Sequence, residues 1–332
     1  MDNVSTILNQ LPKTEIYIIK SIAKAGEELG FPVYLVGGFV RDLFIGKPTF
    51  DLDFLIDGEA AKFSAVLKDC WSEHLANIPA PFKNISFKKY FTSKLLFEQE
   101  LLPGQTVIDF ASMRTEEYPE PAKPPVVSLA GIDEDLDRRD FSVNAMAISL
   151  RSDSFGDLID KHNGHLDLKN STLRVLHQDS FIDDPARILR GVRLAKRHGF
   201  KFEDATRELL QEAREAGLIT HLPARRLFDE FRKALLEPEP HRVLKELDRD
   251  GLLVQILPQV KICSNMLKDV VRISESIKQS KELSADRQSW KVILVRILGD
   301  LSDSEFEQQL ERFGQNEKEI KALFQARESL FS

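Results

Sequence analysis

The chain has 332 residues, of which 42% are hydrophobic and 30% are charged, a composition typical of a soluble globular protein. Its formal net charge is −7, so the molecule as a whole does not attract a polyanion, and a nucleic-acid binder of this charge must gather its basic residues locally. The two cysteines fit no disulfide or metal pattern, and neither a secretion signal nor an apolar run of membrane-spanning length is visible, so we expect a cytoplasmic protein of two or three domains with no membrane partner.

The first predicted elements surround a pair of glycines. Apolar residues at three-and-four spacing predict a largely helical segment over residues 5–30, which leads into a short β-branched and aromatic strand, Val33–Val36. Gly37 and Gly38 interrupt that strand, and helical spacing follows over Phe39–Ile45. Paired glycines at a strand-to-helix turn let backbone N–H groups approach a phosphate closely, although a tight turn without a ligand is the commoner use of such a pair.

Two aspartates at positions i and i+2 open the next predicted strand, Asp51–Ile56. In a strand Asp51 and Asp53 point to the same face, and neighbouring carboxylates repel unless a cation, usually a divalent metal, lies between them. A solvated strand face is the usual explanation, but the flanking apolar residues indicate a largely buried strand in which unused acids are costly. The glycine turn and the acids together predict phosphoryl or nucleotidyl transfer.

A third carboxylate, Asp109, interrupts the short apolar strand predicted over Thr106–Ala111. Before this strand the sequence predicts a helix over about residues 59–70 and strands over residues 85–87 and about 90–97. Asp109 is either a strand-end acid that faces solvent or a third metal ligand laid beside the first two by an adjacent strand. The first aspartate pair favours the second interpretation.

The middle of the chain combines a proline-rich segment with a basic triplet. Residues 116–131 contain four prolines and predict a mobile loop. The triplet Arg138-Arg139-Asp140 opens directly into the apolar run Phe141–Leu150, which places its side chains at the edge of a core rather than on a solvated helix end. Residues 155–167 then predict a hairpin.

A helix with regularly spaced arginines is predicted from Asp184-Pro185, an N-cap followed by an N1 proline, to a stop at Gly199. Its arginines recur every three or four residues and share one stripe: Arg187, Arg190, Arg193 and Arg197. A solvated basic face is the usual meaning of such a stripe. Arginine in place of lysine, with an acid at the head of the stripe, instead favours recognition of a planar group.

The remaining sequence is helical in pattern. Two helices are predicted over Glu203–Ala216 and Ala224–Leu236, and the proline-rich Glu237–Pro240 ends the second. From His241 to Ser332 helical spacing continues, so we expect an all-α body.

Four of these motifs, in this order, resemble those of the class II tRNA nucleotidyltransferases (CCA-adding enzymes) and related bacterial poly(A) polymerases of the polymerase-β superfamily. The motifs are Gly37–Asp42 with Asp51–Asp53, Arg138–Ala145, Asp183–Arg187 with Arg190 and Arg193, and Arg226–Glu230. The resemblance covers roughly residues 33–236. It implies an α+β fold with a nucleotidyltransferase head at residues 1–176, built on a small mixed β-sheet with flanking helices, a helical neck for nucleobase selection at 177–237, and an all-α RNA-binding body and tail at 238–332.

The resemblance also implies roles for the candidate residues of the head. The catalytic and metal-binding acids, which would hold two Mg²⁺ ions, are Asp51, Asp53 and Asp109. The residues that would contact the phosphates and ribose of the incoming nucleotide are Gly37, Gly38, Arg41, Arg139 and Asp140.

In the neck, Asp184 and Arg187 would read the base of CTP or ATP. A carboxylate accepts a hydrogen bond from the exocyclic amine of cytosine or adenine, whereas uracil and guanine present a carbonyl there. Arg190 and Arg193 would support that pair or the triphosphate. The family often has Glu where this chain has Asp183, whose side chain is one methylene shorter, so the resemblance leaves the role of Asp183 open.

The implied activity is template-independent addition of C, C and A to the 3′ end of tRNA from CTP and ATP, with the tRNA 3′ end and acceptor arm as partner and no obligate protein partner. A CC-adding or A-adding partial enzyme and a poly(A) polymerase share all four motifs and stay open. A non-catalytic RNA- or nucleotide-binding module is expected to have lost a metal acid, and a metal-dependent phosphohydrolase to carry a His-Asp cluster that the C-terminal half does not show.

Overall fold

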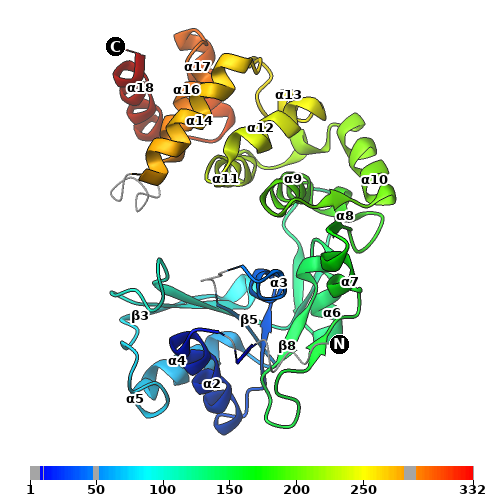
Figure 1. Ribbon diagram of the computed structural model, residues 1–332, viewed down its shortest axis with the longest axis vertical. Coiled ribbons are helices and arrows are strands. Elements are labelled where there is room, and N and C mark those ends of the chain that lie inside the picture. The colour runs from blue at the N-terminus through cyan, green and yellow to red at the C-terminus, as the bar shows by residue number, and fades with distance from the viewer. Residues whose placement is uncertain (1–7, 10, 48–51, 280–288, 332) are drawn as a thin grey trace. The chain divides into compact units, whose positions relative to one another are not determined.

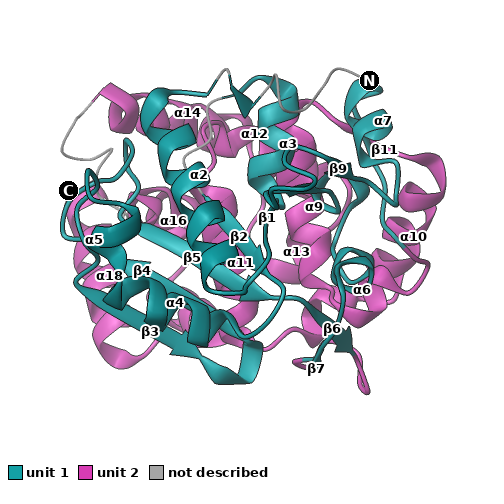
Figure 2. Cartoon of the chain, turned by 90° about the horizontal axis from the view of Figure 1, so that it is seen from below, with its two compact units in different colours: residues 1–117, 125–176 teal, residues 118–124, 177–332 magenta. Residues whose placement is uncertain are grey.

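The computed structural model describes residues 8–9, 11–47, 52–279 and 289–331 (Figure 1). Their contacts separate two compact units, coloured differently in Figure 2. Unit 1 comprises Met1–Glu117 and Pro125–Leu176, and unit 2 comprises Tyr118–Pro124 and His177–Ser332. The chain therefore leaves unit 1 briefly at residues 118–124 before its final passage into unit 2.

Unit 1 is built on a seven-stranded sheet with the order β3-β4-β5-β2-β1-β8-β9. Its strands are β1 (Val33–Val36), β2 (Asp53–Ile56), β3 (Lys83–Phe87), β4 (Thr92–Leu96), β5 (Val107–Ser112), β8 (Ala147–Ser149) and β9 (Leu158–Ile159). Strands β2 and β5 are parallel and the other neighbours are antiparallel, so the predicted mixed sheet is confirmed.

Helices pack against both faces of this sheet. The helical elements of unit 1 are α2 (Lys13–Glu28), α3 (Gly38–Ile45), α4 (Ala60–Asp69), α5 (Trp71–His74), η1 (Lys88–Tyr90), α6 (Ile132–Asp137), η2 (Ser142–Asn144) and α7 (Gly164–Lys169). Phe63 of α4 packs edge-on against Phe110 of β5, which stacks on Phe54 of β2. Since side chains alternate along a strand, Phe54 and Phe110 face α4, and Asp53 and Asp109 lie on the other face, where Leu136 of α6 clusters with Leu55.

Two sequence predictions in unit 1 are wrong. The loop predicted over residues 116–131 is too long: β6 (Arg114–Glu117) and β7 (Val126–Leu129) pair as an antiparallel hairpin, and the loop is confined to the proline-containing residues 118–125 between them. Residues 155–167 are not a hairpin, because β9 pairs with β8 and α7 follows. The Asp160 carboxylate accepts hydrogen bonds from the backbone N–H groups of Gly164 and His165, which caps a helix where the sequence indicated a turn. The last strand of the unit is β10 (Thr172–Leu173).

The strand predicted over Asp51–Ile56 begins later than expected, at Asp53, and Asp51 lies outside the described residues. The predicted helix over residues 59–70 is α4. The strands predicted around residues 85–87, 90–97 and 106–111 are β3, β4 and β5.

Among the described residues of unit 2, the regular elements are helices, as the sequence predicts, apart from the short strand β11 (Lys201–Phe202). Its helical elements are α8 (Ser180–Asp183), α9 (Ala186–His198), α10 (Asp204–Glu215), η3 (Leu218–His221), α11 (Ala224–Leu235), α12 (Pro240–Arg249), α13 (Leu253–Ile256), α14 (Ser264–Gln279), α16 (Trp290–Leu298), α17 (Asp303–Arg312) and α18 (Glu317–Phe331). An aromatic cluster joins α11 to α16 through the contact of Phe228 with Trp290. Gly199, at φ 77°, ends α9 where the sequence placed its stop.

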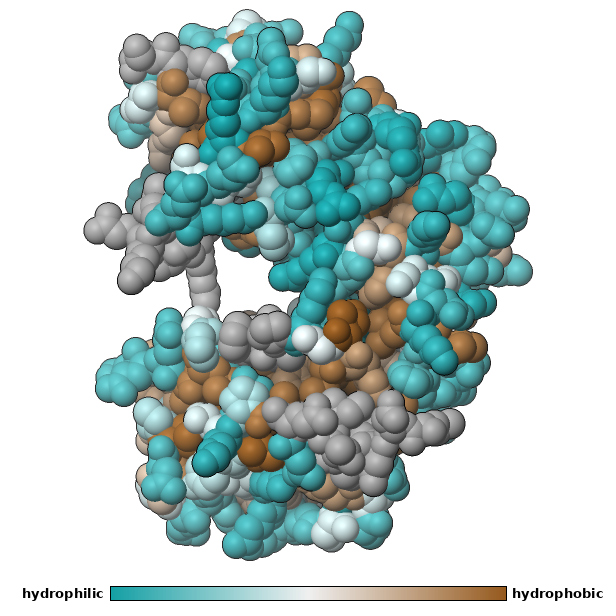
Figure 3. Space-filling model, viewed as in Figure 1, coloured by the Kyte–Doolittle hydropathy of each residue, from teal (hydrophilic) through white to brown (hydrophobic). Residues whose placement is uncertain are grey.

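Hydrophilic residues cover most of unit 2 on the face shown in Figure 3. Across the described part of the chain, no helix combines the length and the apolar character needed to cross a membrane.

Candidate functional site

The glycine turn of unit 1 lies beside an arginine and an aspartate. Gly37 precedes α3 with φ 69°, a conformation that glycine adopts without strain. A methyl group on Gly37 would lie 3.2 Å from Arg139 Nη1 and 3.9 Å from Asp53 Oδ2. The turn, the guanidinium and the carboxylate therefore converge on one spot, next to the first backbone N–H groups of α3, which suit an anion such as a phosphate.

Two of the predicted acids are direct neighbours in the sheet. Asp53 of β2 and Asp109 of β5 are register partners on parallel strands, so both carboxylates lie on the face that α4 does not cover. Oxygen ligands from adjacent strands suit Mg²⁺, which takes one or two protein carboxylates and completes its coordination with water and phosphate. No group of three metal-ligating side chains occurs among the residues searched, but these exclude Asp51, so a three-acid site stays a prediction.

A lysine that the sequence did not single out completes this row. Lys94 of β4 is the register partner of Asp109, and its Nζ lies 2.6 Å from Asp109 Oδ1. Both side chains are about two-fifths exposed, at 41% and 39%. An ammonium group thus neutralises the Asp109 carboxylate from the side opposite Asp53.

Arg139 is held by a carboxylate that the sequence analysis also missed. Asp135, on α6, has a side chain with 0% exposure. Its Oδ2 accepts a hydrogen bond from Arg139 Nη2 at 2.9 Å, and its Oδ1 accepts one from Arg138 Nε at 2.9 Å. The i,i+3 and i,i+4 spacing of these three residues was the signal that could have revealed the arrangement. One buried acid therefore contacts both arginines of the triplet, and Glu116 also pairs with Arg138 at 2.9 Å.

Arg41 and Asp140 are joined through Asn144. Arg41 Nη1 donates to Asn144 Oδ1 at 2.7 Å, and Asn144 Nδ2 donates to Asp140 Oδ1 at 2.9 Å. Arg41 Nε also donates to Asp42 at 2.8 Å, and the Arg41 side chain is only 7% exposed. The structure thus brings the first and second motifs together, while a direct contact of Arg41 with a nucleotide stays a prediction.

In unit 2 the predicted base-reading pair lies at the break between α8 and α9. Asp184 is buried, its Oδ1 accepts from the backbone N–H of Ala186 at 3.0 Å, and its Oδ2 accepts from Arg226 Nη2 at 2.6 Å. Arg187 is also buried and donates to Ser180 Oγ at 2.7 Å. Both groups are therefore fixed in orientation by their own unit.

Two further side chains lie close to Arg187. The Tyr118 ring, from the segment of unit 2 that interrupts unit 1, is 6.0 Å from the Arg187 guanidinium, at the limit of a cation–π contact. His177 Nε2 lies 3.4 Å from Arg187 Nη1 and 3.9 Å from Asp183 Oδ2. Burial raises the pKa of the Asp183 carboxyl.

The arginine stripe of α9 is not a solvated face. Arg190 and Arg193 pair with Glu230 of α11 at 3.7 Å and 3.4 Å, and Arg193 also pairs with Glu237 at 2.9 Å. Burial alone would raise the pKa of Glu230, but Arg190, Lys233 and Arg193 hold it below its usual value. These ion pairs brace α9 against α11, and a contact of Arg190 or Arg193 with a triphosphate stays a prediction.

His177, which lies beside Arg187 and Asp183, predicts that the stability of the protein falls at acid pH. Burial and the neighbouring Arg187 lower the pKa of His177 below 6.5, so its contribution to stability is complete above pH 6.5 and is lost as the pH falls through the folded-state pKa. We expect His177→Asn to flatten the dependence of Tm on pH below pH 6.5. Thermal unfolding of this variant and of His221→Asn, an exposed histidine of the same unit, checks it. Equal pH profiles for parent and His177→Asn would contradict it.

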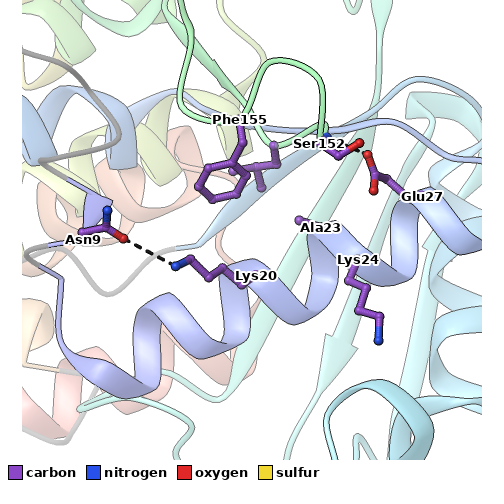
Figure 4. A pocket seen from close by; sticks show the side chains of 8 residues that line it. Asn9, Lys20, Ala23, Lys24, Glu27, Ser152 and Phe155 are labelled. Atoms are coloured by element: carbon purple, nitrogen blue, oxygen red, sulfur yellow. Dashed lines mark hydrogen bonds between the residues drawn. The ribbon is translucent and has the colours of Figure 1, made fainter.

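A surface pocket lies elsewhere in unit 1, between α2 and the segment after β8 (Figure 4). Lys20, Lys24 and Glu27 of α2 line it together with Ser152 and Phe155. None of the predicted site residues lines this pocket.

Comparison with known proteins finds two family models, which match separate parts of the chain. Residues 33–174 match the family model described as the poly A polymerase head domain, and residues 199–263 match the probable RNA and SrmB-binding site of polymerase A. A solved CCA-adding enzyme without ligand is 32% identical, with a TM-score of 0.78 over 98% of this chain and 74% of that one. The chain belongs to the tRNA nucleotidyltransferase and poly(A) polymerase family. The predicted resemblance is thereby confirmed.

Two other members of the tRNA nucleotidyltransferase and poly(A) polymerase family carry more specific names. The CCA-adding enzyme of Thermotoga maritima, solved in complex with tRNA, is 30% identical with a TM-score of 0.71 over 98% of this chain and 73% of that one. The A-adding tRNA nucleotidyltransferase of Geobacter sulfurreducens is 33% identical over 299 residues, which are 89% of this chain and 32% of the relative. The chain thus spans about a third of that relative's length.

Proposed function

We propose that the protein is a tRNA nucleotidyltransferase that adds C, C and A to the 3′ end of tRNA from CTP and ATP. The observation that carries this proposal is the pairing of Asp53 with Asp109 on one face of the sheet, beside the Gly37 turn and Arg139. Acids that suit a metal, a backbone turn that suits a phosphate and a guanidinium beside both are what transfer from a nucleoside triphosphate requires.

Asp53 and Asp109, with Asp51, would hold two Mg²⁺ ions. Bound there, Mg²⁺ lowers the pKa of the RNA 3′-hydroxyl and neutralises charge on the triphosphate and the leaving pyrophosphate. The backbone N–H groups after Gly37 and the Arg139 guanidinium orient the triphosphate. Asp135 keeps Arg139 in place for this purpose, because Asp135 Oδ2 accepts a hydrogen bond from Arg139 while Oδ1 accepts one from Arg138.

Base selection belongs to the second unit in this proposal. The Asp184 carboxylate accepts from the exocyclic amine of cytosine or adenine, and Arg187 donates to the ring nitrogen. The contacts of these groups with Arg226 and Ser180 support the role, because a template made of protein must not reorient between substrates. We assign residues 1–176 to a catalytic head, 177–237 to a neck that selects the base, and 238–332 to a body that binds RNA. The proposed tRNA substrate favours a cytoplasmic location.

A partial enzyme that adds only the terminal A is the second candidate. The name of the Geobacter sulfurreducens relative favours it, whereas the names of the matched structures favour the complete activity. Both candidates share the chemistry proposed for Asp53 and differ in which RNA ends they accept.

Primer extension tests the proposal and separates the candidates. The full chain is incubated with Mg²⁺ and with tRNA transcripts that end before CCA, after C or after CC, each with labelled CTP or ATP. Extension of all three to CCA, followed by arrest, supports the complete enzyme, and extension of the CC-ended transcript alone with ATP supports the A-adding one. Long A tails would identify a poly(A) polymerase. Phosphate release from nucleotide without RNA, or no extension, would contradict nucleotidyl transfer.

A further inference from the structure

One segment of this acidic chain contains no acids at all. Between Glu73 and Glu98 there is neither Asp nor Glu, although the chain as a whole has 53 acidic residues. The same segment contains four lysines: Lys83, Lys88, Lys89 and Lys94. It is therefore the kind of local basic region that a nucleic-acid binder with a net charge of −7 needs.

This segment forms the edge of the sheet in unit 1. It comprises β3, the η1 turn and β4, and β3 is the terminal strand (Figure 1). Phe87 and Tyr90 are 43% and 36% exposed, and Lys83, Lys88 and Lys89 are exposed beside them. Lys89 Nζ lies 5.5 Å from the centre of the Tyr90 ring. Exposed aromatic rings between lysines are typical of surfaces that bind single-stranded nucleic acid by stacking on bases and neutralising phosphates.

The strand register places part of this edge on the same face as the candidate acids. Ile85 pairs with Lys94, Lys94 with Asp109, and Asp109 with Asp53, so these four residues form one row across the sheet. At about 4.8 Å between strands, the row extends roughly 14 Å from Asp53 to Ile85. Lys94, paired with Asp109, is the point where the basic edge meets the acids.

Lys83 and Phe87 lie two residues to either side of Ile85 and therefore share its face. The alternate residues of β3 point the other way. Asn84 and Ser64 of α4 are hydrogen-bonded at 3.1 Å. Helix α4 thus occupies the opposite face of β3, and the face that carries Lys83 and Phe87 continues that of the acids.

We propose that Lys83, Phe87, Lys94 and the 88–90 turn, together the β3 platform, bind the unpaired 3′ strand of the RNA and lead it toward Asp53 and Asp109. The proposal rests on the proposed function and adds to it a substrate-binding surface on the head. The lysines neutralise RNA phosphates, Phe87 and Tyr90 stack on bases, and the absence of acids removes repulsion along the path. An incoming nucleotide alone would not need aromatic groups so far from the acids.

The test compares two triple variants with the same change of charge. Lys83→Glu, Lys88→Glu and Lys89→Glu are combined in one full-length protein. The control combines Lys13→Glu and Lys24→Glu of α2 with Lys62→Glu of α4, three exposed lysines on helices of the opposite face. Binding of a CC-ended tRNA is measured without nucleotide at several salt concentrations, and KM is then measured separately for tRNA and ATP.

We expect the platform variant to bind tRNA at least tenfold more weakly than the control, with a salt slope smaller by about 2, since each lost single-strand phosphate contact removes about 0.7. Phe87→Ala, which leaves the charge unchanged, should weaken binding about fivefold or more. The KM for ATP should not change in either protein.

Four results would overturn the proposal. They are equal weakening in the platform and control variants, a rise confined to the KM for ATP, absence of tRNA binding by the parent, and a parent dimer that Phe87→Ala dissociates while tRNA affinity is unchanged. The last result would make the strand edge a site for a second chain. If tRNA binding falls as expected but the parent adds no nucleotide, the proposed activity fails and the β3 platform stands.

Discussion

Asp53→Asn is expected to lower the rate of nucleotide incorporation about a thousandfold or more while the fold stays intact. Asparagine keeps the size of the side chain but removes the charge that would hold Mg²⁺. A loss of about 4 kcal/mol of transition-state stabilisation, within the range of metal-ion catalysis, corresponds to this factor. The measurement is single-turnover addition of ATP to CC-ended tRNA at saturating Mg²⁺.

The matched control for this variant is Asp57→Asn. Asp57 is exposed and follows β2 directly, so its substitution changes the charge by the same amount at the other end of the strand. We expect Asp57→Asn to keep the parent rate, and both variants to keep the parent Tm. Incorporation by Asp53→Asn within tenfold of the parent would remove Asp53 from the metal site. Lost incorporation together with a lowered Tm would mean that Asp53 acts through folding.

The elements around Asp53 were predictable because local patterns determine them. Short apolar runs that contain an acid indicated β2 and β5, and the two glycines between a strand and a helix indicated the turn, where Gly37 adopts a φ of 69° without strain. The prediction failed where a tertiary contact overrides the local pattern. Four prolines suggested a loop at residues 116–131, yet the backbone around them pairs as β6 and β7. The turn residues before α7 concealed a helix that Asp160 caps from outside.

The partners of the site residues were less predictable than the elements. The sequence predicted that Asp109 lies on a strand beside Asp53. Its pairing with Lys94 depends on the exact strand register, because a slip of one residue would move Lys94 to the other face of the sheet. The arginine stripe of α9 was visible, whereas its partner Glu230 lies on another helix. Charge patterns along a sequence thus reveal candidates for recognition, and only the packing of elements separates structural ion pairs from groups that remain accessible to a ligand.

The second large expected effect is a loss of stability and of nucleotide binding in Asp135→Asn. The buried Asp135 carboxylate contacts both Arg138 and Arg139. Asp135→Asn leaves Arg138 and Arg139 without the carboxylate that binds both, at a position with 0% exposure. Removing one partner of a buried ion pair costs about 3–5 kcal/mol when the remaining charge is left uncompensated, and here that charge is Arg139, because Arg138 keeps its ion pair with Glu116 at 2.9 Å. For a chain of 332 residues, whose unfolding entropy is about 2.1 cal/mol/K per residue, that corresponds to a Tm lower by roughly 4–7 °C. Thermal unfolding checks this expectation.

Activity separates a positioning role from a purely structural one. At a temperature where Asp135→Asn is fully folded, we expect the KM for ATP to rise about tenfold or more and the KM for tRNA to stay the same, because Arg139 is no longer held beside Gly37. Asp133→Asn, an exposed acid on the same helix, should change stability by less than about 1 kcal/mol and leave both KM values unaltered. If Asp135→Asn lowers Tm and the folded variant still binds ATP normally, Asp135 only stabilises α6, and the orientation of Arg139 must come from elsewhere in unit 1. If the KM for ATP rises about tenfold or more while the KM for tRNA stays the same, Asp135 positions Arg139 for nucleotide binding without contacting the nucleotide itself.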